Sequence, residues 1–188
     1  MRRLIVSNIM SLDGFFESRD KKLDWFIVDE EFLAYSRDML RSVDTIVFGR
    51  GTYEHMAAYW PSAPMDEIAD AMNTLPKIVF SGTLKKADWN NSRLVKANAA
   101  MEIAKLKQQP GKDMVILGSA ALASALLNEG LIDEYRVILT PLLIGSGHPL
   151  FQEITRRIRF RLQKTKLLSS GVVVLYYEPL GKFPEVDT

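Results

Sequence analysis

Three glycine turns carry the side chains in this sequence that are best suited to bind a ligand. They are Phe48-Gly49-Arg50-Gly51-Thr52, Phe80-Ser81-Gly82-Thr83 and Leu117-Gly118-Ser119-Ala120, and each follows an apolar run of strand length. Glycine lets the backbone come close to a ligand. A helix that starts after such a turn offers free N–H groups, which suit a phosphate. The turns therefore indicate a phosphate-bearing ligand, for which a dinucleotide is a candidate; the alternative is that each glycine serves only its turn.

Side chains within these turns strengthen the phosphate interpretation. Arg50 and Thr52 add a guanidinium and a hydroxyl to the first turn, and Ser81 and Thr83 add hydroxyls to the second. Arginine matches the geometry of a phosphate monoester. The more familiar nucleotide motifs are absent, because the chain has no P-loop sequence and the segment Gly145-Ser146-Gly147-His148-Pro149-Leu150 lacks the last glycine of a G-x-G-x-x-G fingerprint. We expect that segment to be a loop between sheet strands.

Other kinds of site are excluded or disfavoured by residue type. The sequence has no cysteine, which excludes disulfides, thiolate metal sites and cysteine nucleophiles. The two histidines, His55 and His148, have no clustered acidic residues, so we expect no metal site. A net charge of +1, from 24 basic and 23 acidic residues, argues against nucleic acid or an anionic membrane as the main partner.

The elements that must position the turns follow from the pattern of apolar residues. Strand-length apolar runs alternate with helix-period segments, which predicts an α/β fold with a mostly parallel sheet and helices on both faces. Two long antiparallel strands are expected at the C-terminal edge. Strands are predicted at 4–9, 45–48, 77–80, 93–95, 114–117, 135–139, 160–168 and 172–178, and helices from the cap at Asp29 to Leu40 and at 52–59, 65–72, 99–107 and 120–127.

Length and composition set the domain organisation. The 188 residues suit one domain, which we place at residues 1–180, with a flexible tail at 181–188. No stretch approaches the ~20 apolar residues of a membrane span. The N-terminal apolar run is too short for a secretory leader, which needs ~7–15 apolar residues. We therefore expect a cytoplasmic protein with no membrane partner.

An ordered set of segments resembles the dihydrofolate reductase superfamily. The likeness is greatest to the branch of the C-terminal reductase domain of the riboflavin-biosynthesis deaminase/reductase and its stand-alone bacterial relatives. It extends over residues 3–178. Its segments are Met10-Ser11-Leu12-Asp13-Gly14, Leu23-Asp24-Trp25, Val47 to Glu54, Val79 to Thr83, Val115 to Ala120, and Gly130 to Glu134 running into Thr140 to Gly147.

This resemblance implies a three-layer sandwich like that of dihydrofolate reductase, with NADPH as the cofactor. Arg50, Gly51 and Thr52, with Gly49, would match the turn that holds the pyrophosphate and the 2′-phosphate. The residues implied elsewhere are Ser81, Gly82 and Thr83 beside the 2′-phosphate, Gly118, Ser119, Ala120 and Ala121 under the pyrophosphate and nicotinamide, and Ser7, Asn8 and Ile9 under the nicotinamide.

The resemblance also implies residues that contact substrate. Asp13 is the candidate to orient substrate or assist proton transfer, although an aspartate before Gly14 also suits a plain turn. Trp25 and Asp24 would border the substrate pocket, and Trp25 could instead be core or lid packing. Tyr53 could reach the cleft or simply pack. The acid that holds the pterin ring in dihydrofolate reductases could be Asp24, Asp29, Glu30 or Glu31.

Three functions are compatible with these residues. The first is an NADPH-dependent reductase of a small heterocycle, either pterin-like or like the 5-amino-6-ribosylaminouracil phosphate of the riboflavin pathway. The second is a broad-specificity NADPH reductase of carbonyl or nitro compounds. The third is a nucleotide-binding module without turnover. The resemblance further implies a homodimer, since relatives commonly pair through their sheets.

Overall fold

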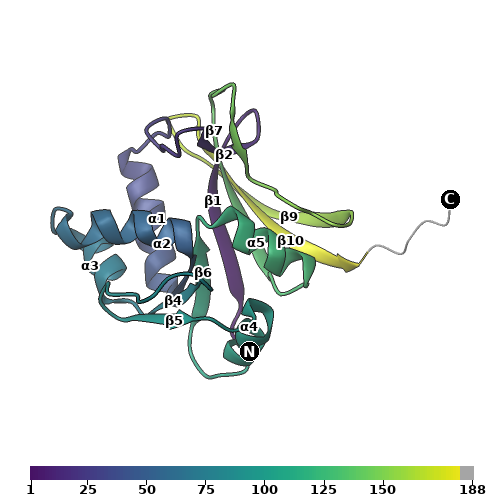
Figure 1. The fold of residues 1–188 in the computed structure, drawn as a ribbon. Coiled ribbons are helices and arrows are strands. Elements are labelled where there is room, and N and C mark those ends of the chain that lie inside the picture. Colours follow the sequence, from purple (N-terminus) through teal and green to yellow (C-terminus); the bar gives the residue numbers. More distant parts are fainter. Residues whose placement is uncertain (183–188) are drawn as a thin grey trace.

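The computed structural model describes residues 1–182 and centres on an eight-stranded sheet of order β5-β4-β3-β6-β1-β7-β10-β9 (Figure 1). Its strands are β1 (Leu4–Ser11), β3 (Val43–Gly49), β4 (Lys77–Phe80), β5 (Ser92–Val95), β6 (Asp113–Leu117), β7 (Glu134–Thr140), β9 (Ile158–Leu167) and β10 (Val173–Lys182). The helices are α1 (Glu30–Ser42), α2 (Arg50–Tyr59), α3 (Glu67–Thr74), α4 (Ala99–Lys107) and α5 (Ala120–Asn128), and a 3-10 turn η1 (Trp60–Ser62) follows α2.

The pairing of the strands confirms the predicted sheet. Strand β1 is parallel to both β6 and β7, and β3 is parallel to both β4 and β6. Strand β10 is antiparallel to β7 and β9. The carboxyl ends of the parallel strands therefore meet at one edge of the sheet, which is where open α/β sheets bind ligands. No helix in residues 1–182 combines the length and apolar character needed to cross a membrane.

The central strands are buried on both faces, which gives the three layers. Neighbouring side chains of a strand point to opposite faces. Thus Ile46 and Phe48 pack with α1, α2 and α3, whereas Val47 between them packs with α4 and α5; all three are fully buried. Figure 1 shows the two helix groups on opposite sides of the strands. The predicted three-layer α/β sandwich is confirmed.

Two short strands were not expected from the sequence. Strands β2 (Phe15–Ser18) and β8 (Gly147–Pro149) form a separate antiparallel ribbon. The prediction of a plain loop at 145–150 was therefore wrong for 147–149, because a strand this short, containing glycine and proline, has no readable period. At the other end of the chain, β10 includes Gly181 and Lys182. The remainder of the predicted tail, 183–188, lies outside the described residues.

Lys77 is a lysine in the core of the helix-covered sheet. Its side chain is 1% exposed, and Nζ donates hydrogen bonds to the carbonyls of Asn73 (3.2 Å), Leu75 (2.8 Å) and Asn90 (3.0 Å). Nζ also lies 4.4 Å from the centroid of the Trp89 ring. Burial lowers the pKa of this ammonium group to about 8, from an ordinary value of 10.5.

This lowered pKa predicts a dependence of stability on pH. Between pH 8 and pH 10.5 the unfolded chain holds the Lys77 proton more tightly than the folded chain does, so the free energy of unfolding rises with pH in this window. Relative to Lys77→Met, the wild type should gain about 1–3 kcal/mol across it. Urea unfolding of both proteins at pH 8, 9 and 10 measures the difference in their free energies of unfolding. The tyrosine titrations contribute equally to both proteins and therefore cancel in this difference. Parallel pH profiles would contradict the prediction.

Candidate active site

A cavity of about 1090 Å³ opens at the carboxyl ends of the central strands. Strand β1 contributes Ser7 and Ile9 to its wall, and the first and third glycine turns contribute Gly49–Thr52 and Gly118–Ala121. The volume exceeds the ~300–1,000 Å³ of an ordinary small-molecule pocket. The cavity is therefore large enough for an extended ligand.

Two helices begin at this cavity without a side-chain cap. The N-caps of α2 and α5 are Gly49 and Ser119, and neither accepts a hydrogen bond with its side chain from the first turn of its own helix. The other three α-helices are capped in that way, by Asp29, Asp66 and Asn98. The first-turn N–H groups of α2 and α5 therefore remain available, and both helix dipoles favour an anion there.

The first and third turns are joined by hydrogen bonds. The Gly49 N–H donates to Ser119 Oγ, and the Ser119 N–H donates to Thr52 Oγ1, each over 2.9 Å. Gly118 has a φ of +67°, and a Cβ atom there would lie 2.9 Å from Thr52 Cγ2. Both the positive φ and the short distance to Thr52 require a glycine at this position. The turns consequently present one fixed surface to a ligand.

The second turn meets this surface through Arg50. Its Nη1 donates to Thr83 Oγ1 over 2.9 Å, and its Nε lies 3.7 Å from the Glu54 carboxylate. Ser81 Oγ accepts from the Thr83 N–H over 3.2 Å. Ser81, Gly82 and Thr83 are not among the residues that line the cavity, whereas Arg50 is. The arginine and these hydroxyls thus stand next to each other at the side of the cavity nearest β4.

The inner wall of the cavity holds a pair of buried hydroxyls. Ser7 Oγ lies 3.1 Å from Tyr35 Oη; the two residues are 6% and 4% exposed and both line the cavity. Burial raises the pKa of the Tyr35 hydroxyl, while the Ser7 hydroxyl and the Arg136 guanidinium act in the opposite direction. The phenol is therefore neutral at physiological pH. Sequence reasoning missed Tyr35, because its only signal was a place on the apolar face of α1, which core tyrosines share.

Asp13 lies outside the cavity wall. Its carboxylate accepts from the Gly145 N–H (2.7 Å), from the Ile144 N–H (3.3 Å) and from Ser11 Oγ (2.6 Å). The Ser11 hydrogen bond is the main cause of its lowered pKa. A carboxylate that is ionised and surrounded by donors in this way holds two loops together and is a poor proton donor.

The predicted substrate contacts lie beside the cavity rather than on it. Trp25 Nε1 donates to the Lys22 carbonyl over 3.2 Å, and neither Trp25 nor the exposed Asp24 lines the wall. Tyr53 is 4% exposed, and its hydroxyl accepts from the Trp89 N–H over 2.9 Å. It faces the sheet because α2 begins at Arg50 and turns that side of the helix inward.

Two of the four acids considered for a pterin ring, Asp29 and Glu31, have structural partners. Asp29 accepts from the Phe32 N–H as the cap of α1, and Glu31 accepts from the Ser169 hydroxyl. The acids that line the cavity are instead Glu17, Glu54 and Asp66. Among residues 1–182, no three His, Asp or Glu side chains are grouped so as to hold a metal ion.

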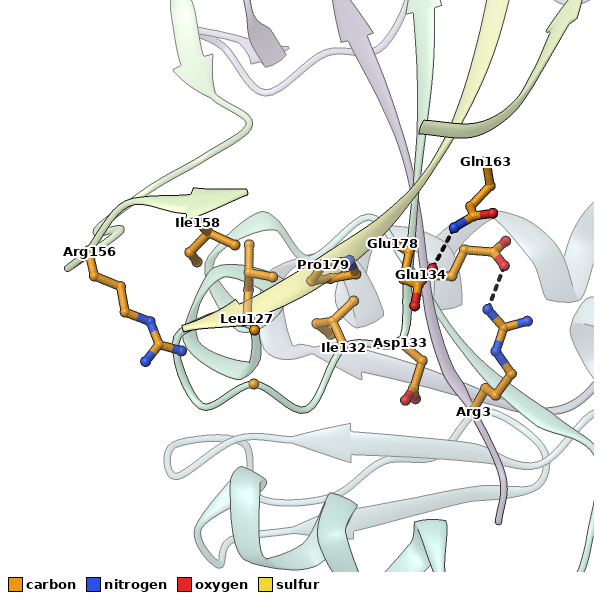
Figure 2. A pocket seen from close by; sticks show the side chains of 12 residues that line it. Arg3, Leu127, Ile132, Asp133, Glu134, Arg156, Ile158, Gln163, Glu178 and Pro179 are labelled. Carbon is orange, nitrogen blue, oxygen red and sulfur yellow. Dashed lines mark hydrogen bonds and ion pairs between the residues drawn. The ribbon is translucent and has the colours of Figure 1, made fainter. Parts of the chain in front are cut away.

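A second cavity, of about 620 Å³, lies at the opposite end of β1 and β7 (Figure 2). On its wall Arg3 pairs with Glu134 (2.8 Å), and the lining residues Asp133 and Glu178 pair with Lys107 (2.6 Å) and Arg161 (2.7 Å) outside the wall. The remaining charged residue on the wall, Arg156, donates to the Asn128 carbonyl over 2.7 Å. Figure 2 shows the first of these contacts beside the cavity. The charged side chains of this cavity therefore have partners within the protein, whereas the cavity at the carboxyl ends collects the glycine turns; the latter is the candidate site.

Comparisons with known proteins agree with this fold. Residues 2–174 match the family of the RibD C-terminal domain. The Bacillus subtilis protein YyaP is 34% identical, over 94% of each chain. A crystal structure from Shewanella sp. PV-4, described as that of a riboflavin biosynthesis protein, superposes with a TM-score of 0.76 at 26% identity, covering 94% of this chain and 98% of that one.

The fold extends to a better-known enzyme. Dihydrofolate reductase from Enterococcus faecalis, complexed with NADP(H), has a TM-score of 0.65 at 16% identity, covering 95% of this chain and 97% of its own. That likeness concerns the fold alone. The match over residues 2–174 places the chain in the RibD C-terminal domain family, and its fold is like that of dihydrofolate reductase.

Proposed function

We propose that this protein is an NADPH-dependent reductase of a small heterocyclic substrate. The observation that carries the proposal is the pair of uncapped helix N-termini, α2 and α5, joined through Ser119, Gly49 and Thr52 at the carboxyl ends of β3 and β6. Such a surface suits a pyrophosphate, because several N–H groups and two helix dipoles act on one anion. The family of the RibD C-terminal domain and the dihydrofolate reductase fold support the same cofactor.

The residues of the cavity fit the parts of NADPH. The backbone at Gly49–Thr52 and Gly118–Ala121 would hold the pyrophosphate, and Arg50 with Thr83 and Ser81 would hold the 2′-phosphate. Ser7 and Ile9 would lie against the nicotinamide. When bound, NADPH supplies a hydride, and a C=N or C=O bond of the substrate takes up that hydride together with one proton from solvent.

The protein's own part in the reaction is to position the substrate and to exclude water from it. Tyr35 and Ser7 would hydrogen-bond the polar edge of the substrate at the inner wall. The β2–β8 ribbon contributes Phe16, Glu17 and His148 to the wall and would cover the reacting groups. Asp13 would keep its loop in place at Gly145, so we propose it as a positioning residue.

A second candidate is a reductase of broad specificity for carbonyl or nitro compounds. Among the described residues, none of the carboxylates on the cavity wall (Glu17, Glu54 and Asp66) hydrogen-bonds Tyr35, which favours this candidate, since a dedicated pterin site would need an acid to hold the ring. Comparing kcat/KM for a dihydropterin, a quinone and a nitroarene would separate the two candidates.

The direct test of the proposed function is a titration with NADPH and, separately, with NADH. Trp60 lines the cavity, so quenching of tryptophan fluorescence should report occupancy. We expect NADPH to bind at micromolar concentration and NADH far more weakly. If neither binds at millimolar concentration, the reductase proposal fails.

Arg50→Ala should reduce the preference for NADPH. The guanidinium would form charge-assisted hydrogen bonds to the 2′-phosphate, so its loss should weaken NADPH binding by about 10–30-fold and leave NADH binding unchanged. Arg93→Ala is a matched control, because Arg93 has the same 54% side-chain exposure and pairs with Glu102 outside the cavity wall. Calorimetric titration gives both affinities. Equal losses for the two nucleotides would remove Arg50 from the 2′-phosphate role.

A further inference from the structure

The part of the cavity away from the glycine turns has aromatic and aliphatic walls. On one side, Phe26 and the α1 residue Phe32 contact edge to face, with ring centroids 5.7 Å apart. Elsewhere on the wall, Tyr59 and Trp60 form a second edge-to-face pair, with ring centroids 5.1 Å apart. Leu33 of α1 also lines the cavity. Two aromatic pairs on the wall of one cavity suit a flat ring system.

Two polar groups on these walls are already used within the protein. Trp60 Nε1 lies 3.2 Å from Met56 Sδ, and the Ser36 hydroxyl donates to the Phe32 carbonyl over 2.9 Å. Neither group is therefore free to bind the charged tail of a ligand. The walls offer mainly apolar surface.

Positive charge is scarce around the cavity. Among the described residues, Lys21 and Arg50 are the only lysine or arginine side chains on its wall. Arg50 belongs to the glycine turns and is bonded to Thr83, and Lys21 is exposed in the loop after β2. A phosphate or carboxylate buried against the aromatic walls would lose its water without gaining a cation, which is strongly unfavourable.

The polar side chains on the inner wall are also uncharged, because the Arg136 guanidinium beside Tyr35 is not on the wall and pairs with Glu134. Tyr35 and Ser7 offer two hydroxyls, and burial keeps the phenol protonated. A hydroxyl can donate to a neutral carbonyl or ring nitrogen and can accept from a ring N–H. They do not require a charged group on the ligand.

From this arrangement we infer that the substrate is a neutral, flat heteroaromatic compound with an apolar substituent and with no phosphate or carboxylate tail. The inference rests on the proposed function and narrows it, because it sets this site apart from one built for a phosphoribosyl intermediate. The ring would meet Tyr35 and Ser7, and the substituent would lie between Phe32 and Trp60.

A pair of probes that differ in one charge tests the inference. The probes are 6-phenylpterin and 6-(4-carboxyphenyl)pterin, and binding is measured by calorimetry on the cofactor-free protein and again with saturating NADPH. We expect 6-phenylpterin to bind at least 10-fold more tightly in both states. Equal affinities, a preference for the carboxylate, or binding of neither probe would overturn the inference.

A substitution that adds a charge to the wall gives a test that loss of folding cannot mimic. Leu33→Arg should improve binding of 6-(4-carboxyphenyl)pterin by at least 10-fold and weaken 6-phenylpterin. Leu143→Arg is the control, since Leu143 is 69% exposed and does not line the cavity, and it should change neither affinity. An unchanged probe preference in Leu33→Arg would overturn the inference.

The NADPH titration keeps the two proposals apart. If NADPH binds tightly and the carboxylate probe is preferred, the reductase proposal is supported and the inference of a neutral substrate is wrong. If NADPH does not bind and 6-phenylpterin is preferred, the reductase proposal is wrong and the inference of a neutral ligand is supported.

Discussion

Gly118→Ala is expected to weaken NADPH binding by about 100-fold, or ~2.7 kcal/mol. The native φ of +67° disfavours any residue with a Cβ, and that atom would lie 2.9 Å from Thr52 Cγ2. Thr52 must then move, although its Oγ1 accepts the Ser119 N–H. The N–H groups of the first and third turns would no longer face one anion, and each charge-assisted hydrogen bond lost costs about 1.5–3 kcal/mol.

Gly130→Ala is the matched control for backbone strain. Gly130 has a φ of +70° at the other end of α5, and nothing lies within 4 Å of a Cβ placed there. Both substitutions should lower the free energy of unfolding by about 1–2 kcal/mol, because both place alanine in the left-handed region. Calorimetry with NADPH and urea unfolding separate the two effects. If Gly130→Ala weakens NADPH binding as much as Gly118→Ala does, backbone strain alone accounts for the loss of affinity.

Gly147→Ala, which adds a single methyl group to the β2–β8 ribbon, should greatly reduce both stability and turnover. A Cβ there would lie 2.1 Å from the backbone oxygen of Glu17, and backbone cannot move aside as a flexible side chain can. The two strands must separate, at about 3 kcal/mol of stability. Phe16, Glu17 and His148 would shift within the cavity wall, and a displacement of this size at a reaction centre can lower turnover by about 100-fold.

Gly145→Ala is the control that tests whether the effects of Gly147→Ala come from the close approach of β8 to β2 or only from the loss of a loop glycine. Gly145 has a φ of +74° and no atom within 4 Å of a Cβ placed there, so alanine should cost only about 1–2 kcal/mol. Urea unfolding and NADPH oxidation with a dihydropterin measure both variants. Similar turnover in the two would show that the spacing of the ribbon does not matter for the site.

The sequence predicted elements well where the apolar pattern was long or the cap was strong. The strand at 45–48 lies within β3, and Asp29 caps α1 by accepting from the Phe32 N–H over 2.7 Å. The helix expected at 65–72 begins two residues later, at Glu67, because Asp66 caps it and accepts from the Ala69 N–H. The ribbon of β2 and β8 could not be predicted, since its pairing joins two short segments far apart in the chain.

For the candidate site, turn chemistry could be predicted but the direction of side chains could not. The first and third glycine turns lie on the cavity because strand ends and helix starts fix the backbone there. Trp25 and its neighbours show the limit: Leu23 and Phe26 line the cavity and Trp25 does not. In an irregular loop no period assigns a face. Tyr35 was missed for the opposite reason, since a helical period assigns a buried face without distinguishing core from cavity.

The hydrogen bonds between Gly49, Ser119 and Thr52 make two distant turns one cooperative unit. Neither turn can open alone without leaving a partly buried N–H group unpaired, so the backbone order that a ligand needs is already present after folding. Binding an anion there would lose little further conformational entropy. Stability of the fold and affinity at the site are thereby coupled at this point, and a substitution that loosens one turn should weaken both together.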